Sequence, residues 1–136
     1  MSMQILPFAF FSSTGINLVN YNANEVVLKS DTIPDNFIGR LKDLNTIFTT
    51  SGGTLAYEIL HKSGGVTRFA SNRTSNDNGT FDLVVTEGDR LAIRLTSTGS
   101  GVIDVLWHGE IQQIREIDQS KVAKIEEFDF LPKGGI

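Results

Sequence analysis

The sequence predicts an all-β protein, an antiparallel β-sandwich of two sheets with an N-terminal arm and a short C-terminal tail. Apolar and polar residues alternate along residues 81–85, 91–95 and 103–107, as they do in strands with one face in a core. Short turns that contain glycine, at residues 87–89 and 99–101, join these runs. Turn residues recur about every 10 residues, a spacing typical of sandwiches and barrels.

The length, the lack of cysteine and the charge of the chain argue against several classes of function. The chain has 136 residues and no cysteine, so it fits one domain that folds without disulfide bonds and has no thiolate chemistry. The formal net charge is -4 and no run of Lys or Arg occurs, which argues against nucleic acid or a membrane surface as a partner. The longest apolar stretch, residues 5–11, is too short to span a bilayer and lacks the basic leader of a signal peptide. We therefore expect no nucleic-acid and no membrane partner.

Residues 1–14 are predicted to form an N-terminal arm or the first strand of the sandwich. Phe8, Phe10 and Phe11 lie here without a charged neighbour, and such an apolar segment has to be covered. If its own sheet covers it, the segment is a strand. If a neighbouring subunit covers it, these three phenylalanines are the contacts of a docking arm.

Residues 15–115 are predicted to form the sandwich domain. Besides the three runs above, strands are expected at 16–19, 25–29, 54–61 and 66–70. Residues 37–51 are ambiguous, because the first half has helical spacing and the second half is rich in β-formers; we assign only the second half to a strand. Trp107 shares a strand face with Ile103 and Val105 and is assigned to the core rather than to a sugar-binding platform.

Residues 116–136 are predicted to be a C-terminal tail. The sequence becomes charged after Ile114 and the last eight residues, DFLPKGGI, have the composition of an extended end. Chain ends of this kind are ordered only when something ties them down, so we expect the tail to become ordered on contact with a partner.

The polar segment 71–79, SNRTSNDNG, is the strongest candidate for ligand contact, because exposed loops on a rigid sandwich commonly carry binding residues. It matches a calcium-binding EF-hand loop only in the middle, since Thr74 and Val85 stand where the first and last oxygen ligands belong. No metal is therefore predicted. The candidate loop contacts are Asn72, Arg73, Asn76, Asp77 and Asn78.

Neither histidine has a recognisable catalytic partner in the sequence. Asp104 and His108 share a strand face, but four residues along a strand span about 13 Å, which is too far for a hydrogen bond. The outward carboxylates are expected to be solvated rather than paired as in a glycosidase; they are Glu58, Asp82, Asp104 and Glu110. The sequence thus predicts no enzyme, no catalytic residue and no cofactor.

The order of strands and turns resembles a known kind of module. Its pieces are Thr49-Thr-Ser-Gly-Gly53, then Thr54-Leu-Ala-Tyr-Glu-Ile-Leu60, His61-Lys-Ser-Gly-Gly65, Val85-Thr-Glu-Gly-Asp-Arg-Leu-Ala-Ile-Arg-Leu95 and Ser97-Thr-Gly-Ser-Gly-Val-Ile-Asp-Val105. Over residues 38–111 the chain resembles the jelly-roll β-sandwich modules of tailed-bacteriophage virion proteins, of the capsid-decoration, head-fibre or tail-tip type. The likeness rests on strand order, on short polar turns and on the Glu-Gly-Asp-Arg-Leu start of a late strand.

The resemblance implies a structural protein located in the virion. Such a subunit binds the major capsid protein or another virion protein, stabilises the capsid, and is commonly a homo-oligomer, with a trimer favoured. The sequence has neither the heptads nor the collagen-like repeats of a fibre shaft, which favours a small auxiliary or decoration subunit. The alternative is a carbohydrate- or receptor-binding module of a phage tail or fibre, whose loops contact a host glycan.

Overall fold

The computed structural model describes residues 3–115, and these residues form eight strands and one short 3₁₀ helix, η1. The elements in chain order are β1 (Ile5–Asn17), η1 (Leu18–Asn20), β2 (Glu25–Lys29), β3 (Phe37–Thr50), β4 (Thr54–Leu60), β5 (Val66–Arg73), β6 (Asp77–Val85), β7 (Arg90–Ser97) and β8 (Val102–Gln113). The tail predicted at 116–136 lies outside the described residues.

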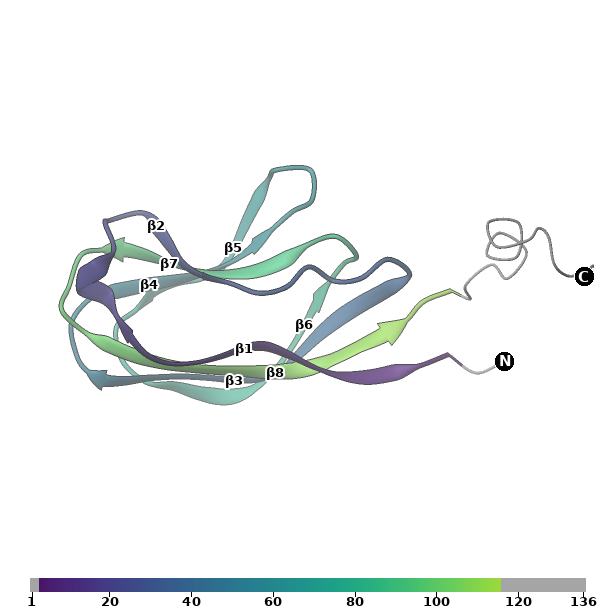
Figure 1. The fold of residues 1–136 in the computed structure, drawn as a ribbon, viewed down its shortest axis with the longest axis horizontal. Coiled ribbons are helices and arrows are strands. Elements are labelled where there is room, and N and C mark those ends of the chain that lie inside the picture. Colours follow the sequence, from purple (N-terminus) through teal and green to yellow (C-terminus); the bar gives the residue numbers. More distant parts are fainter. Residues whose placement is uncertain (1–2, 116–136) are drawn as a thin grey trace, which may run out of the picture.

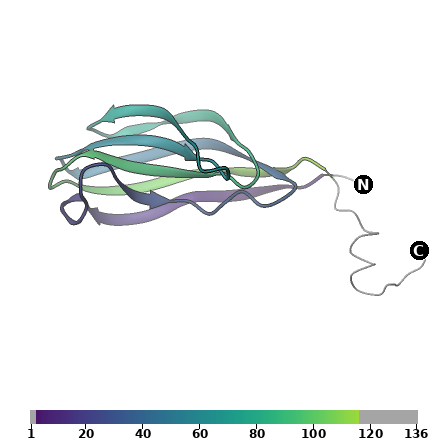
Figure 2. The ribbon, with the colours of Figure 1, turned by 90° about the horizontal axis from the view of Figure 1, so that it is seen from above.

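The strands form two four-stranded antiparallel sheets, with the orders β1-β8-β3-β6 and β2-β7-β4-β5. The pairing is nested: β1 pairs with β8, β2 with β7, β3 with β6, and β4 with β5. This is the topology of a jelly roll, which divides eight strands between two packed sheets. The two layers are visible in Figure 1, and the strands run along the long axis of the molecule in Figure 2. The predicted fold class, an all-β sandwich of two antiparallel sheets, is confirmed.

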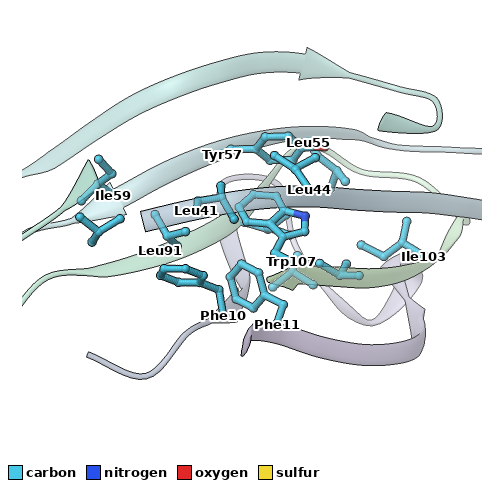
Figure 3. Close-up of a cluster of buried hydrophobic side chains, with 14 of the residues drawn as sticks. Phe10, Phe11, Leu41, Leu44, Leu55, Tyr57, Ile59, Leu91, Ile103 and Trp107 are labelled. Carbon is cyan, nitrogen blue, oxygen red and sulfur yellow. The ribbon is translucent and has the colours of Figure 1, made fainter. Parts of the chain in front are cut away.

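Trp107 of β8 lies at the centre of the core, fully buried between the layers. Its ring makes edge-to-face contacts with Phe11 of β1 at 5.0 Å and with Tyr57 of β4, in the other sheet, at 4.7 Å between centroids. The indole N–H donates a hydrogen bond to the hydroxyl of Thr46 on β3 at 3.0 Å. Figure 3 shows Trp107 between Tyr57 on one side and Phe10 and Phe11 on the other. The assignment of Trp107 to the core is confirmed.

The apolar N-terminal segment is covered by its own sandwich. Phe10 and Phe11 are each only 4% exposed and belong to the core, while Phe8 is half-buried and packs on Phe10. Pairing with β8 slips between Ala9 and Phe11, and this β-bulge lets two successive phenylalanines face inward. Burial in the chain's own core contradicts the alternative that Phe10 and Phe11 are contacts of a docking arm; residues 5–14 belong to β1.

Two other segments differ from the prediction. The first half of 37–51, whose spacing looked helical, is part of β3, because pairing with β8 on one side and β6 on the other outweighs local pattern. The strand expected at 16–19 ends at Asn17, whose side chain accepts a hydrogen bond from the Val19 amide at 3.2 Å and caps η1. Asparagine at this position favours a turn over a continued strand.

Two glycines within strands are required by close packing. A Cβ atom added at Gly109, in the middle of β8, would collide with the carbonyl oxygen of Arg40 on β3. One added at Gly39 on β3 would be 3.2 Å from the ring of Phe10 and closer still to the side chain of Ile33. At Gly109 the backbone of β3 excludes a side chain, whereas at Gly39 the side chains of Ile33 and Phe10 would have to shift.

The core can be tested at Ile93, which is fully buried on β7. We predict that Ile93→Ala lowers the free energy of unfolding by about 2–5 kcal/mol, because it removes buried apolar volume and leaves a cavity. Val66→Ala on β5, where the side chain is exposed, should change it by less than about 0.5 kcal/mol. Urea unfolding followed by Trp107 fluorescence measures both, and equal losses would contradict this arrangement of the core.

Candidate functional site

A pocket with a volume of about 190 Å³ opens where the edge of one sheet faces the edge of the other. The edges are β5 and β6, the outermost strands of their sheets. The floor comes from Leu44 of β3 and Tyr57 of β4, both buried. The remaining lining residues lie on β5 and β6: Ala70, Arg73, Asp77, Asn78, Gly79, Thr80 and Phe81.

The pocket gathers three of the five predicted loop contacts, namely Arg73, Asp77 and Asn78. The predicted loop 71–79 is much shorter than expected, because β5 runs to Arg73 and β6 begins at Asp77. Asn72 and Asn76 do not line the pocket. The Asn76 side chain instead accepts a hydrogen bond from the Phe48 amide at 2.7 Å and ties the turn to β3.

Both strands that border the pocket carry a bulge. Ala70 stands opposite Tyr57 but Arg73 stands opposite Leu55, so β5 carries an extra residue between them. Asn72 absorbs it with a φ of 57°, a left-handed conformation that asparagine tolerates. β6 carries a similar irregularity between residues 80 and 83. Bulges commonly redirect side chains at functional edges of sheets.

Asp77 is the polar centre of the pocket. Its carboxylate accepts a hydrogen bond from the hydroxyl of Tyr57 and forms an ion pair with Arg73, at 3.8 Å between Nη1 and Oδ1. Burial, followed by the hydrogen bond to Asp77, raises the pKa of Tyr57 far above its ordinary value. The phenol therefore stays protonated at every ordinary pH and remains a hydrogen-bond donor to the carboxylate.

On one side of the pocket, a series of aromatic rings extends from the core to the surface. The ring of Phe69 lies 6.3 Å from Trp107 and 6.0 Å from Phe81, which is 40% exposed. The sequence predicted Phe81 to point inward with Leu83 and Val85. The prediction of burial is wrong, because β6 is the outermost strand of its sheet and leaves Phe81 partly open to solvent. An exposed ring beside a carboxylate and a guanidinium suits a small ligand with one apolar face and several hydroxyl groups.

The sequence analysis missed Tyr57, Gly79 and Phe81 as pocket residues. Tyr57 and Phe81 have the alternating pattern of core positions, and only the pairing of β5 and β6 with different sheets brings them to an opening. Gly79 belonged to the polar segment 71–79 in the sequence analysis, and only the structure places it inside a strand, where a glycine often marks close approach of another group.

Glu58 is not a solvated carboxylate, contrary to expectation, because it is only 2% exposed. It lies on the outer face of β4, where Arg68 of β5 and Arg94 of β7 each donate to its carboxylate at 2.9 Å. Arg68 stands directly across from Glu58, the position where opposite charges stabilise a sheet. With both oxygens held by guanidinium groups, Glu58 acts as a cross-strand tie.

Two of the other three outward acids, Asp82 and Asp104, have partners of their own. Asp82 is exposed and forms an ion pair with Arg40 at 3.2 Å. Asp104 accepts a hydrogen bond from the amide of Gly15 at 2.7 Å. These carboxylates therefore hold backbone or surface partners on β1 and β3.

His61 has a partner that the sequence analysis did not identify. Its Nδ1 lies 2.8 Å from the carboxylate of Asp89 and its Nε2 lies 2.6 Å from the hydroxyl of Thr67. Thr67, His61 and Asp89 therefore lie in the order of the nucleophile, base and carboxylate of a catalytic triad. A triad also needs amide donors aimed at an oxyanion, and two amides of the adjoining turn, those of His61 and Gly64, already bond carbonyls within the turn. We assign His61 and Asp89 to holding the β4–β5 turn against the β6–β7 turn.

Asp89 is the anchor of that contact. Its carboxylate also accepts hydrogen bonds from the Lys62 amide and the Thr86 hydroxyl, both at 2.9 Å. Burial raises the pKa of Asp89, but the hydrogen bonds from Lys62, His61 and Thr86 together outweigh it and hold the pKa below its ordinary value.

A lowered carboxyl pKa predicts a loss of stability in acid. The contribution of Asp89 is fully present above the ordinary aspartate pKa of about 4 and is lost as the pH falls through the lower folded-state value. We predict a flatter decline for Asp89→Asn than for wild type in urea unfolding between pH 7 and pH 3. The control Asp82→Asn changes an exposed carboxylate and should keep the wild-type decline. Identical curves for Asp89→Asn and wild type would show that Asp89 adds no acid sensitivity.

Comparison of the chain with protein-family models, curated proteins and solved structures found no match. The resemblance to bacteriophage virion modules therefore stays a prediction from the sequence pattern. Within residues 3–115, no helix is long and apolar enough to cross a membrane. In the same part of the chain, no three His, Cys, Asp or Glu side chains gather into a group that could hold a metal ion.

Proposed function

We propose that this chain is a non-enzymatic structural protein of a virion, an auxiliary or decoration subunit that binds and stabilises a phage capsid. Its partners are the major capsid protein or another virion protein, and further copies of itself, with a trimer favoured. Jelly rolls occur in viral capsid domains but also in lectins and cupins, so the fold alone does not decide the function. The observation that carries the proposal is an apolar surface at one end of the sandwich.

Four large apolar side chains are exposed where β1 begins and β8 ends, each between 41% and 57% exposed. We call them the end patch: Met3, Ile5, Leu6 and Ile114. The two strand ends lie together, because Ile5 stands opposite Gln112 and the Gln113 amide bonds the Gln4 carbonyl at 2.8 Å. Ile5 and Leu6 are successive in β1 and so point to opposite faces of the sheet. Exposed apolar side chains on both faces of one sheet end favour contact with a partner.

The adjoining strand offers a second means of contact. β1 is the outermost strand of its sheet, with β8 as its one neighbour, and its outer edge carries backbone groups that can pair with another chain. Apolar burial at the end patch together with strand pairing along β1 would give a subunit a contact that repeats over a lattice. Many such contacts in an array bind far more tightly than one.

The proposal predicts that charge at the end patch removes assembly without unfolding the sandwich. The double variant Ile5→Asp with Leu6→Asp should lower binding to assembled particles by about tenfold or more, because it would bury unpaired charge at the contact. Co-sedimentation with particles measures the binding, and sedimentation velocity measures the oligomeric state. We expect the variant to shift toward the monomer.

The matched control is Val19→Asp, which adds a charge at an exposed apolar residue of η1, at the opposite end of β1. It should bind particles and assemble as wild type does. Wild-type binding by the end-patch variant, or equal loss in the control, would overturn the assignment of the end patch. Failure of the wild-type chain to sediment with particles would overturn the virion function.

We infer a second candidate function, carbohydrate or receptor recognition by a phage tail or fibre module, from a different observation. The pocket between β5 and β6 brings Arg73, Asp77 and Asn78 together beside an exposed phenylalanine ring. A host glycan offers the matching combination of hydroxyl groups and apolar faces. The pocket is lined by β3, β4, β5 and β6, whereas the end patch lies at the start of β1 and the end of β8. The two share no residue, so one subunit has room for both roles.

A further inference from the structure

One position in the pocket lacks a side chain although the fold has room for it. Gly79 of β6 stands opposite Leu44, and Asp77 opposite Thr46. Residues directly opposite in antiparallel strands point to the same face, and Leu44 and Thr46 are buried between the sheets. A Cβ atom at residue 79 would therefore point toward the space between the sheets.

Neither packing nor backbone conformation accounts for the glycine. A Cβ atom added at Gly79 meets no other atom within 4 Å, in contrast to Gly39 and Gly109 on β3 and β8 of the same sheet. Gly79 also does not adopt a positive φ, so other residues fit its backbone. In a strand interior a glycine weakens the strand and commonly marks close approach by a ligand. The space beside Gly79 is part of the pocket.

We propose that the pocket binds a single neutral sugar ring, which occupies the space left by Gly79; this inference rests on the second candidate function. The volume of about 190 Å³ is slightly above the ~150 Å³ of a protein cavity that holds one benzene ring. It admits one ring, while further units of a glycan would extend into solvent.

The polar groups match adjacent hydroxyls of such a ring. Asp77 Oδ1 and Arg73 Nη1 are 3.8 Å apart, beyond the distance of a direct hydrogen bond. One hydroxyl donates to the carboxylate and its neighbour accepts from the guanidinium. Tyr57 fixes the other carboxylate oxygen from below, so Asp77 is held ready for the ligand.

The apolar side and the charges determine the class of sugar. The C–H face of the ring would lie on Phe81, because the face of an aromatic ring is electron-rich and attracts polarised C–H groups. One carboxylate and one guanidinium line the pocket together, so neither an acidic nor a basic sugar has an unopposed partner. A neutral ring meets no repulsion from either group.

The test fills the pocket at residue 79. We predict that Gly79→Val abolishes sugar binding, with at least a tenfold loss of affinity, while the melting temperature stays the same or rises. The probes are the methyl glycosides of glucose, galactose, mannose and N-acetylglucosamine, titrated into ¹⁵N-labelled full-length protein. For at least one probe, wild type should show saturable shifts of the amides of residues 77–81.

The matched control is Gly65→Ala in the β4–β5 turn, where a Cβ atom makes only ordinary contacts and φ is not positive. It should bind as wild type does. Phe81→Leu keeps an apolar side chain without the ring and should weaken binding with the fold intact. Circular dichroism and the melting temperature check the fold of each variant.

The outcomes separate the site from the function. Binding by Gly79→Val at wild-type affinity, or shifts that map outside the pocket, would overturn the site and leave glycan recognition standing. No binding of any probe by wild type, together with no binding on a glycan array, would overturn glycan recognition itself. Array binding without binding of any single ring would overturn the single-ring inference alone.

Discussion

Burial of the Trp107 indole between the two sheets is the interaction on which the rest of the structure depends. The ring touches Phe11 of its own layer and Tyr57 of the opposite one, so it sets the separation of the layers. Its N–H would be a buried, unsatisfied donor without the Thr46 hydroxyl. Thr46 and Leu44 are held in register with β8, because Leu44 stands opposite Trp107. The same contacts place Tyr57 where its hydroxyl reaches Asp77.

The pocket forms where the two sheets of the sandwich end in edge strands. Two sheets that do not close into a barrel leave edge strands on each side, and natural proteins protect such edges with bulges and charged side chains. β5 and β6 show both devices, since each has a register irregularity and the turn between them is flanked by Arg73 and Asp77. The features that protect the edge also supply the polar groups of the pocket.

The sequence predicted strands correctly where one face of a strand packs on the core and the other face does not. The runs from Phe81 to Trp107 predicted strands β6 to β8, and the fold class followed from their alternation. The sequence predicted less where the pairing of strands in the folded sheet decides conformation and burial. Residues 37–44 became a strand because β3 has neighbours on both sides, and a bulge at Phe10 buried two phenylalanines that alternation would have separated. The candidate site was predicted in part: Arg73, Asp77 and Asn78 were identified as polar residues near a turn, whereas Tyr57 and Phe81 read as ordinary core positions. Asp89 could not be linked to His61, because the two residues lie on different turns that only the folded sheet brings together.

The nested pairing has a consequence for how the chain acquires its shape. Of the strand pairs within residues 3–115, only β4 with β5 joins consecutive strands; the pairs β3 with β6, β2 with β7 and β1 with β8 enclose it one after another. Closing each wider loop costs more chain entropy, and topologies dominated by distant contacts fold slowly. On the ribosome β8 would emerge last, although it lies between β1 and β3 and carries Trp107. Until then, β1 would have no neighbour, and its phenylalanines would be open to chaperones or to another nascent chain.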